Sequence, residues 1–161
     1  MSDCRVRPYA STDRDHLQVM MNALQQAERE MEPDRAGWPD RAASYVKLVL
    51  AEVGAKRGAI FVAESPASRL IGFVTCWQEY EDDSTIVETE RDYLYVGDLY
   101  VAEDWRGGGI AGLLLAAAEG HGRALELKQT RIGVLSVNRA ARRSYEKAGF
   151  EEYEMLLRKR L

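Results

Sequence analysis

The chain has 161 residues, an ordinary apolar content and a net charge of −4, and we expect residues 1–161 to form a single domain with a hydrophobic core. A run of about eighteen apolar residues is absent, so no membrane span or membrane partner is predicted. The negative charge argues against a nucleic-acid partner. Cys4 and Cys76 form no metal-type pair and the N-terminus lacks a signal-peptide core, so we expect no metal and a reducing, cytoplasmic location.

The first half of the chain is predicted to supply two helices and a hairpin. The first helix has an apolar stripe that begins at Leu17 and Met20, which indicates packing on a sheet. Prolines and glycine at 33–39 end it. In chain order we expect a strand at 5–9, a helix from the N-cap candidates Ser11, Thr12 and Asp13 to Met31, a helix at 40–53 ended by 54–58, and hairpin strands at 59–63 and 70–77.

An acidic loop follows between Glu79 and Asp92. Such a run is typical of a solvated face. The alternative is a negative rim that attracts a cationic amine. The facing wall would then come from acidic residues in and after the first helix, namely Glu28, Glu30, Glu32 and Asp34.

The central stretch has a strand at 93–101, a glycine-rich turn and a helix that begins at Ile110 and weakens near Gly120 and Gly122. A glycine turn at a helix start exposes backbone N–H groups to phosphate oxygens. Residues 107–112 fit the pattern Gly-x-Gly-x-x-Gly of dinucleotide-binding folds. Glu126 follows at about the sequence separation of the acidic residue that contacts the ribose in those folds. That fold needs several further βα units, and too little chain remains. A helix that merely starts on glycines is the other alternative.

After this helix we expect a fifth strand at 131–137. Asn138 is a helix N-cap candidate and Gly149 a C-terminal stop. A last strand is predicted at 150–157.

Two motifs carry a family resemblance. Arg106-x-x-Gly109-x-Ala111 resembles the phosphate loop of the GNAT acyltransferases, and Asn138-x-x-Ala141-x-x-x-Tyr145-x-Lys147-x-Gly149-Phe150 resembles their second motif. The resemblance implies a mixed α/β fold. Its central sheet is mostly antiparallel, two parallel strands splay apart to admit acyl-CoA, and helices cover both faces.

The resemblance also implies a site for acetyl-CoA as co-substrate. Loop amides would bind the pyrophosphate, with Arg106 adding charge or bracing the loop. The strand backbone would pair with the pantetheine arm, and Asn138 would reach it or simply cap its helix. The implied cofactor-binding residues are Leu99, Tyr100, Val101, Arg106, Gly107, Gly108, Gly109, Ile110, Ala111, Gly112, Asn138, Ala141 and Tyr145.

Tyr145 is the candidate that protonates the departing CoA thiolate, since a phenol and a thiol have pKa values close enough to share a proton. Its alternative role is packing against Phe150. The general base stays open. The positions that often hold Glu or His in the family are Tyr95 and Gly97 here. Asp98 is the nearest carboxylate, although strand alternation predicts that it points away from the acceptor; Glu79, Glu81 and a water chain remain alternatives.

The resemblance implies an N-acetyltransferase that acts on a primary amine. The acidic residues favour a small cationic acceptor such as a polyamine, an aminoglycoside or an amino acid, with a peptide N-terminus as alternative. A non-catalytic acyl-CoA-binding sensor or interaction domain is the competing hypothesis. Relatives are frequently dimers, so a homodimer is among the expected states. The candidate acceptor-binding residues are Glu32, Glu79, Tyr95 and Gly97.

Overall fold

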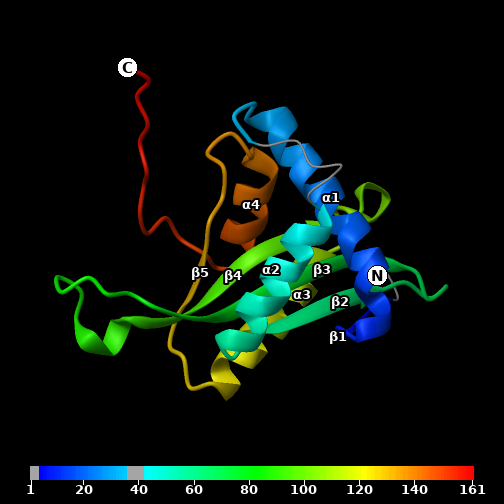
Figure 1. The fold of residues 1–161 in the computed structure, drawn as a ribbon, viewed down its shortest axis with the longest axis horizontal. Coiled ribbons are helices and arrows are strands. Elements are labelled where there is room, and N and C mark those ends of the chain that lie inside the picture. The colour runs from blue at the N-terminus through cyan, green and yellow to red at the C-terminus, as the bar shows by residue number, and fades with distance from the viewer. Residues whose placement is uncertain (1–3, 36–41) are drawn as a thin grey trace.

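A computed structural model describes residues 4–35 and 42–161, and a mixed sheet organises this part of the chain (Figure 1). Its strands lie in the order β1-β2-β3-β4-β5, antiparallel except for the parallel pair β4 and β5. This is the mixed α/β architecture predicted from the sequence. The strands are β1 Arg5–Pro8, β2 Ala59–Glu64, β3 Leu70–Tyr80, β4 Asp92–Val101 and β5 Thr130–Ile132.

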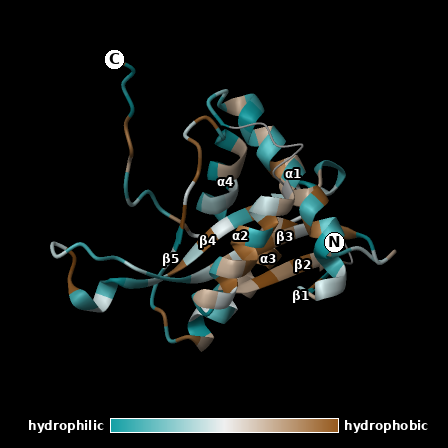
Figure 2. Cartoon of the chain, in the orientation of Figure 1, coloured by the Kyte–Doolittle hydropathy of each residue, from teal (hydrophilic) through white to brown (hydrophobic). Residues whose placement is uncertain are grey.

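Helices cover both faces of the sheet, as expected (Figure 1). Helices α1 (Arg14–Met31) and α2 (Ala42–Ala55) pack on one face, where Leu17 and Met21 meet Phe73 in a buried cluster. Helix α3 (Ile110–Ala124) packs on the other face through Ile110 and Leu114. Helix α4 (Arg139–Lys147) lies beyond β5 in sequence. Figure 2 shows the apolar sheet strands enclosed between these helices.

The start of α1 departs from the simple cap that the sequence predicts. Asp13 is the N-cap residue, but its side chain makes no capping bond to the helix. Its carboxylate instead accepts hydrogen bonds from the Ala10 amide and from both terminal nitrogens of Arg7. Arg7 also donates to Glu64 on β2 at 2.6 Å. This ion-pair cluster ties the first strand, the helix start and the neighbouring strand together.

Helix α3 continues to Ala124, so the predicted weakening near Gly120 and Gly122 is wrong. Gly122 is buried against the sheet, where a Cβ would lie 3.1 Å from the Leu94 side chain. Glycine there allows close packing of helix on strand, and that burial outweighs its low helix propensity. Cys76 lies in the same core, with its thiol directed at the Ala59 carbonyl.

A β-bulge at Gly97 interrupts β4. Asp98 pairs with Thr75 on β3, but the next β3 residue, Cys76, pairs with Val96, so Gly97 is an extra residue. A bulge shifts the alternation of side chains by one position. Leu94 and Val96 face α3 before it, and Leu99 and Val101 face α3 after it.

Two predicted strands at the C-terminal end differ in the structure. The strand expected at 131–137 is only Thr130–Ile132, because the chain leaves β4 after that point. The strand expected at 150–157 is absent, and residues 151–161 are exposed without regular structure. The start of the second helix, predicted at Asp40, lies outside the described residues; α2 is described from Ala42.

Candidate active site

The glycine turn between β4 and α3 presents unpaired backbone N–H groups. Gly107 and Gly109 have φ values of +79° and +83°, and Gly109 is the N-cap of α3. Glycine is the residue that adopts these angles without strain. Across the described residues, none of the amides of 107–112 donates a hydrogen bond. A Cβ at 107, 109 or 112 would meet nothing within 4 Å, so the surface is open to a phosphate group.

The predicted loop residues have distinct local roles. Arg106 donates from Nε to the Val101 carbonyl at 3.0 Å, which braces the turn against the end of β4. Ile110 is buried in the core, so only its backbone is available to a ligand. The Tyr100 side chain points to the face of the sheet that α1 and α2 cover, where its ring stacks on Phe73.

The edge of β4 beyond the bulge is open toward β5. The two strands pair only at Leu94–Thr130, Tyr95–Arg131 and Val96–Ile132. The Ala102 amide donates to Ile71 on β3, so strand alternation turns the backbone groups of Leu99 and Val101 to the other edge. The two parallel strands therefore diverge beside the glycine turn, as the family resemblance implies.

Helix α4 begins at Asn138, whose side-chain oxygen accepts from the Ala141 amide at 3.0 Å. The capping role of Asn138 is thus present. Tyr145 follows on this helix, with its ring 6.0 Å from that of Phe150. Burial, followed by the negative charge of Glu28, raises the pKa of the Tyr145 phenol to about 12.

The bulge brings Asp98 to the face covered by α2. Tyr45 of α2 donates to one carboxylate oxygen at 2.9 Å and Thr75 donates to the other at 3.2 Å. Strict alternation, from which Asp98 is expected to point away from the acceptor, is therefore wrong here, because Gly97 resets the phase of the strand and Asp98 lies on the same face as Tyr95. Burial raises the pKa of Asp98, whereas the bonds from Tyr45 and Thr75 oppose the rise.

Gly97 itself lies beneath the indole of Trp77, where a Cβ would be 2.3 Å from a ring carbon. Trp77 packs edge-on against Tyr95, with the ring centroids 5.4 Å apart. Tyr95 and Gly97 are thus brought next to Asp98. Sequence reasoning missed Tyr45 and the bulge, because a tyrosine on a helix and a glycine in a strand carry no signal of their tertiary partners.

Glu28 on α1 acts on this cluster through its charge. Burial is the largest cause of the raised pKa of Tyr45, Tyr95, Asp98 and Tyr145, and the charge of Glu28 raises each of them further. For the two tyrosines Tyr45 and Tyr95, the nearby Asp98 carboxylate has a larger effect than Glu28. These residues come from α2, β4 and α4, so the charge of one carboxylate on α1 reaches three other elements. The weak signal in the sequence is that Glu28 belongs to the acidic group near the end of the first helix.

The glutamate candidates for the acceptor site are all engaged in ion pairs, and Glu28 itself lies 3.6 Å from the Arg35 guanidinium. Glu79 accepts from Lys56 at 2.6 Å and from the Trp77 indole at 2.8 Å, and these bonds outweigh burial and lower its pKa. Glu81 pairs with Arg131 at 3.2 Å. Glu32, at the end of α1, pairs with Arg158 of the C-terminal segment at 3.0 Å.

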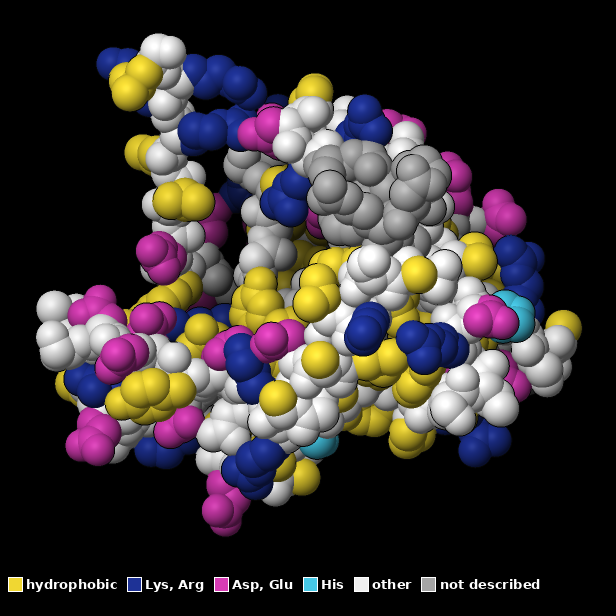
Figure 3. Space-filling model, viewed as in Figure 1, with side chains coloured by type: hydrophobic (Ala, Val, Ile, Leu, Met, Phe, Trp, Pro, Cys, Tyr) yellow, Lys and Arg dark blue, Asp and Glu magenta, His cyan; other side chains and the backbone are white. Residues whose placement is uncertain are grey.

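The acidic loop between β3 and β4 projects beyond the sheet, on the left of Figure 1, while the end of α1 lies at the top. Figure 3 shows its acidic side chains gathered on that projecting lobe. That the two acidic segments face each other stays a prediction. Within the loop, Asp83 accepts from the Thr85 amide and hydroxyl, which stabilises a local turn.

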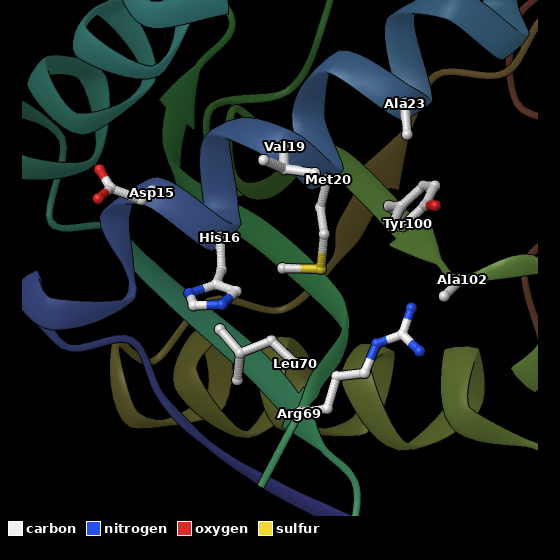
Figure 4. Close-up of a pocket in the computed structure, with 9 residues that line it drawn as sticks. All are labelled: Asp15, His16, Val19, Met20, Ala23, Arg69, Leu70, Tyr100 and Ala102. Carbon is white, nitrogen blue, oxygen red and sulfur yellow. The ribbon is translucent and has the colours of Figure 1, made fainter.

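A separate groove of about 460 Å³ lies between the first half of α1 and the ends of β3 and β4 (Figure 4). Met20 and Leu70 contribute apolar surface, and His16 and Arg69 project toward it from opposite sides. Of the predicted site residues it contains Tyr100 alone. The glycine turn and the Asp98 cluster thus lie outside it.

The mixed sheet with a diverging parallel pair is the fold expected of the acyltransferase class. The model of the acetyltransferase (GNAT) family matches residues 18–150, so the chain belongs to the GNAT family of acetyltransferases. None of the curated proteins searched matches the sequence. Within residues 4–35 and 42–161, no helix is long and apolar enough to span a membrane, and no cluster of His, Cys, Asp and Glu could hold a metal.

Solved structures share this fold at low sequence identity. A point mutant of the BH1408 protein from Bacillus halodurans has a TM-score of 0.84 at 19% identity, over 98% of this chain and 99% of that one. The aminoglycoside 6'-N-acetyltransferase AAC(6')-IG from Acinetobacter haemolyticus has a TM-score of 0.75 at 16% identity, over 98% and 97%. AAC(6')-Iy, solved with a bisubstrate analogue of CoA and acetylneamine, has a TM-score of 0.73 at 18% identity, over 99% of both chains.

Proposed function

We propose that the protein transfers an acetyl group from acetyl-CoA to a primary amine, by direct attack within a ternary complex. The observation that carries the proposal is the open β4 edge, which runs from the Asp98 cluster to the unpaired amides of the glycine turn. Membership of the GNAT family and the CoA-containing relative support the use of acyl-CoA.

The amides of 107–112 would hold the pyrophosphate, and the Leu99 and Val101 backbone would bind the pantetheine arm. A matched pair of variants tests this assignment. Asn and Asp both tolerate the left-handed conformation of Gly109, but only Asp adds a negative charge. Isothermal titration measures acetyl-CoA binding by both variants. We expect Gly109→Asn to weaken binding about tenfold at most. Gly109→Asp should weaken it at least about a hundredfold, because its negative charge repels the phosphates. Equal losses would refute the phosphate role.

The transfer step requires two proton movements. The amine nitrogen forms a bond to the thioester carbon while the carbon–sulfur bond breaks. We propose that the proton of the amine passes through the Tyr45 hydroxyl to Asp98, and that Tyr145 gives its proton to the departing sulfur. A raised pKa makes Asp98 a better proton acceptor than an ordinary carboxylate. Proton exchange with water then returns both groups to their starting states.

The acceptor would lie between α1, α2 and β4. The Glu28 carboxylate would pair with the positive charge of a small cationic acceptor such as a polyamine, an aminoglycoside or an amino acid. Tyr95 and Gly97 would form the adjacent wall of the acceptor site. Glu32 and Glu79 stay candidate acceptor residues, although ion pairs engage both. A peptide N-terminus is the alternative acceptor. Glu28→Gln should raise KM for a polyamine more than it lowers kcat, whereas Asp98→Asn should mainly lower kcat.

The decisive experiment is thiol release from acetyl-CoA in the presence of an amine panel, for the wild-type protein and Tyr145→Phe. We expect amine-dependent release by the wild type and a loss of about 10²–10⁴-fold in kcat for the variant, with acetyl-CoA binding retained. If the wild type binds acetyl-CoA but no amine stimulates release, the protein is the non-catalytic acyl-CoA sensor instead. If it binds no acetyl-CoA, both functions fail.

A further inference from the structure

The groove shown in Figure 4 is a second concave surface of the molecule, which we call the α1 groove. It lies between the first half of α1 and the adjoining ends of β3 and β4, and its volume of about 460 Å³ is typical of a small-molecule site. The glycine turn and the Asp98 cluster lie outside it. A ligand in the α1 groove would therefore not occupy the proposed acetyl-transfer site.

The walls of the α1 groove are mainly apolar. Met20 and Leu70 line it and are nearly buried, whereas Val19, which also lines it, is 69% exposed. The Tyr100 ring, which stacks on Phe73, adds an aromatic surface. A methionine adapts its shape to different apolar groups. Such a concave surface suits the apolar part of a small molecule, because binding removes both surfaces from water.

Arg69 brings a positive charge to the α1 groove from the turn between β2 and β3. Ser65 holds the backbone of Arg69 in place: the Ser65 amide donates to the Arg69 carbonyl at 2.9 Å, and the Arg69 amide donates to Ser65 Oγ at 3.2 Å. Figure 4 shows the Arg69 side chain directed toward Tyr100 and Ala102. Across the described part of the chain, the Arg69 guanidinium makes no ion pair or hydrogen bond. Its N–H donors are therefore available to a ligand.

The charges at the α1 groove favour an anion. His16 projects from the side opposite Arg69 and offers its ring nitrogens to a polar group. Asp15 is the acidic lining residue, and Figure 4 shows its carboxylate turned away from the other labelled side chains. A guanidinium binds a planar carboxylate through two parallel hydrogen bonds. The α1 groove thus combines an apolar surface with a group that suits a carboxylate.

We propose that the α1 groove binds a small carboxylic acid with an apolar body, its carboxylate on Arg69 and its apolar body along Met20, Leu70 and Tyr100. Octanoate is a probe with this chemistry. Because it has few non-hydrogen atoms and the groove is open on one side, we expect a Kd of about 0.1–1 mM. The inference is independent of the proposed function, since the α1 groove and the glycine turn lie apart.

Isothermal titration with octanoate and with octanol, which keeps the chain but lacks the charge, tests the role of Arg69. We expect the wild type to bind octanoate about tenfold more tightly than octanol. Arg69→Gln should weaken octanoate binding about tenfold and leave octanol binding unchanged. Arg69 is exposed, so the thermal unfolding of this variant should match that of the wild type.

Arg29→Gln is the matched control, because Arg29 is an exposed arginine of α1 that does not line the α1 groove. It should bind both probes as the wild type does. No octanoate binding by the wild type up to about 10 mM would overturn the proposal. Equal octanoate affinity of Arg69→Gln and the wild type, or equal wild-type affinity for octanoate and octanol, would overturn it as well.

A substitution that fills the groove tests where the apolar body lies. Ala23 lines the groove and is only partly buried, so Ala23→Phe places a ring there and should weaken octanoate binding about tenfold. Asn22→Phe is the control, since Asn22 is exposed on the same helix and does not line the groove. Saturating acetyl-CoA should leave octanoate binding unchanged. Octanoate binding that acetyl-CoA abolishes, or that Ala23→Phe leaves intact, would refute the location.

The failure of this inference and the failure of the proposed function are distinguishable. If the protein binds no acetyl-CoA, the proposed function fails, and the comparison of Arg69→Gln with Arg29→Gln still decides whether the α1 groove binds a carboxylate. If Arg69→Gln leaves octanoate binding unchanged, this inference fails, and amine-dependent thiol release still tests the proposed function.

Discussion

The bulge in β4 makes Gly97 the position where one added carbon should cost the most. In Gly97→Ala the new Cβ would lie 2.3 Å and 2.6 Å from two carbons of the Trp77 ring. Carbon atoms in contact lie about 3.5–4.0 Å apart, so the ring must retreat by over about 1 Å. Trp77 is held by its bond to Glu79 at 2.8 Å and by its contact with Tyr95. We expect a loss of about 2–3 kcal/mol in the free energy of unfolding, near the upper part of the range for overpacking.

Urea denaturation measures this loss, and a thermal scan should show a fall of about 4–12 °C. Gly120→Ala is the matched control, because a Cβ there meets nothing within 4 Å and a helix-interior alanine should stabilise by about 1 kcal/mol. Trp77→Phe shortens the ring, so the double variant with Gly97→Ala should lose about 1 kcal/mol less than the sum of the single losses. If Gly97→Ala stays within about 0.5 kcal/mol of the wild type, the packing argument for the bulge is wrong.

Three further predictions concern titrating and hydrogen-bonding groups. The pKa of Asp13 is lowered, first by its bond to Arg7. The stabilisation from Asp13 is therefore full above its ordinary pKa and is lost as pH falls through the folded value. Asp13→Asn should cost about 2 kcal/mol at pH 7, and the cost should shrink progressively as pH falls below the ordinary pKa in urea titrations. Tyr45→Phe removes a bond to Asp98 and should lower kcat by about 10-fold or more with KM for acetyl-CoA unchanged; a change in KM alone would contradict the relay. Because the pKa of Tyr145 is about 12, the pH dependence of kcat should show no decline between pH 8 and about pH 10.5 that is due to Tyr145. A decline in this range that disappears in Tyr145→Phe would refute the assignment of Tyr145 as the proton donor.

Much of the fold follows from local sequence signals. The apolar stripe of the first helix, beginning at Leu17, correctly predicts a buried face. The segments 59–63 and 70–77 correctly predict the β2–β3 hairpin, and Asn138 caps its helix as expected. These signals work because propensity, period and capping chemistry act over a few residues and agree with the tertiary packing here.

The errors arise where distant contacts decide the local structure. The facing of Asp98 depends on a bulge, and that bulge depends on the Trp77 ring packed over Gly97, which strict alternation cannot include. The partnership of Tyr45 with Asp98 joins residues from separate elements. The pattern at 150–157 has the alternation of a strand, but a strand needs a partner, and the described part of this chain provides none.

The packing of Cys76 has a practical consequence for measuring the reaction. Release of CoA is commonly read by reagents that react with thiolates, so the thiols of the protein must stay silent. Burial raises the pKa of Cys76 to about 11 and keeps its sulfur from solvent, so at neutral pH this thiol is unreactive toward such reagents. Cys4, which is only partly buried, is then the protein thiol that contributes background in the folded state, and one substitution at that position leaves released CoA as the reporting thiol.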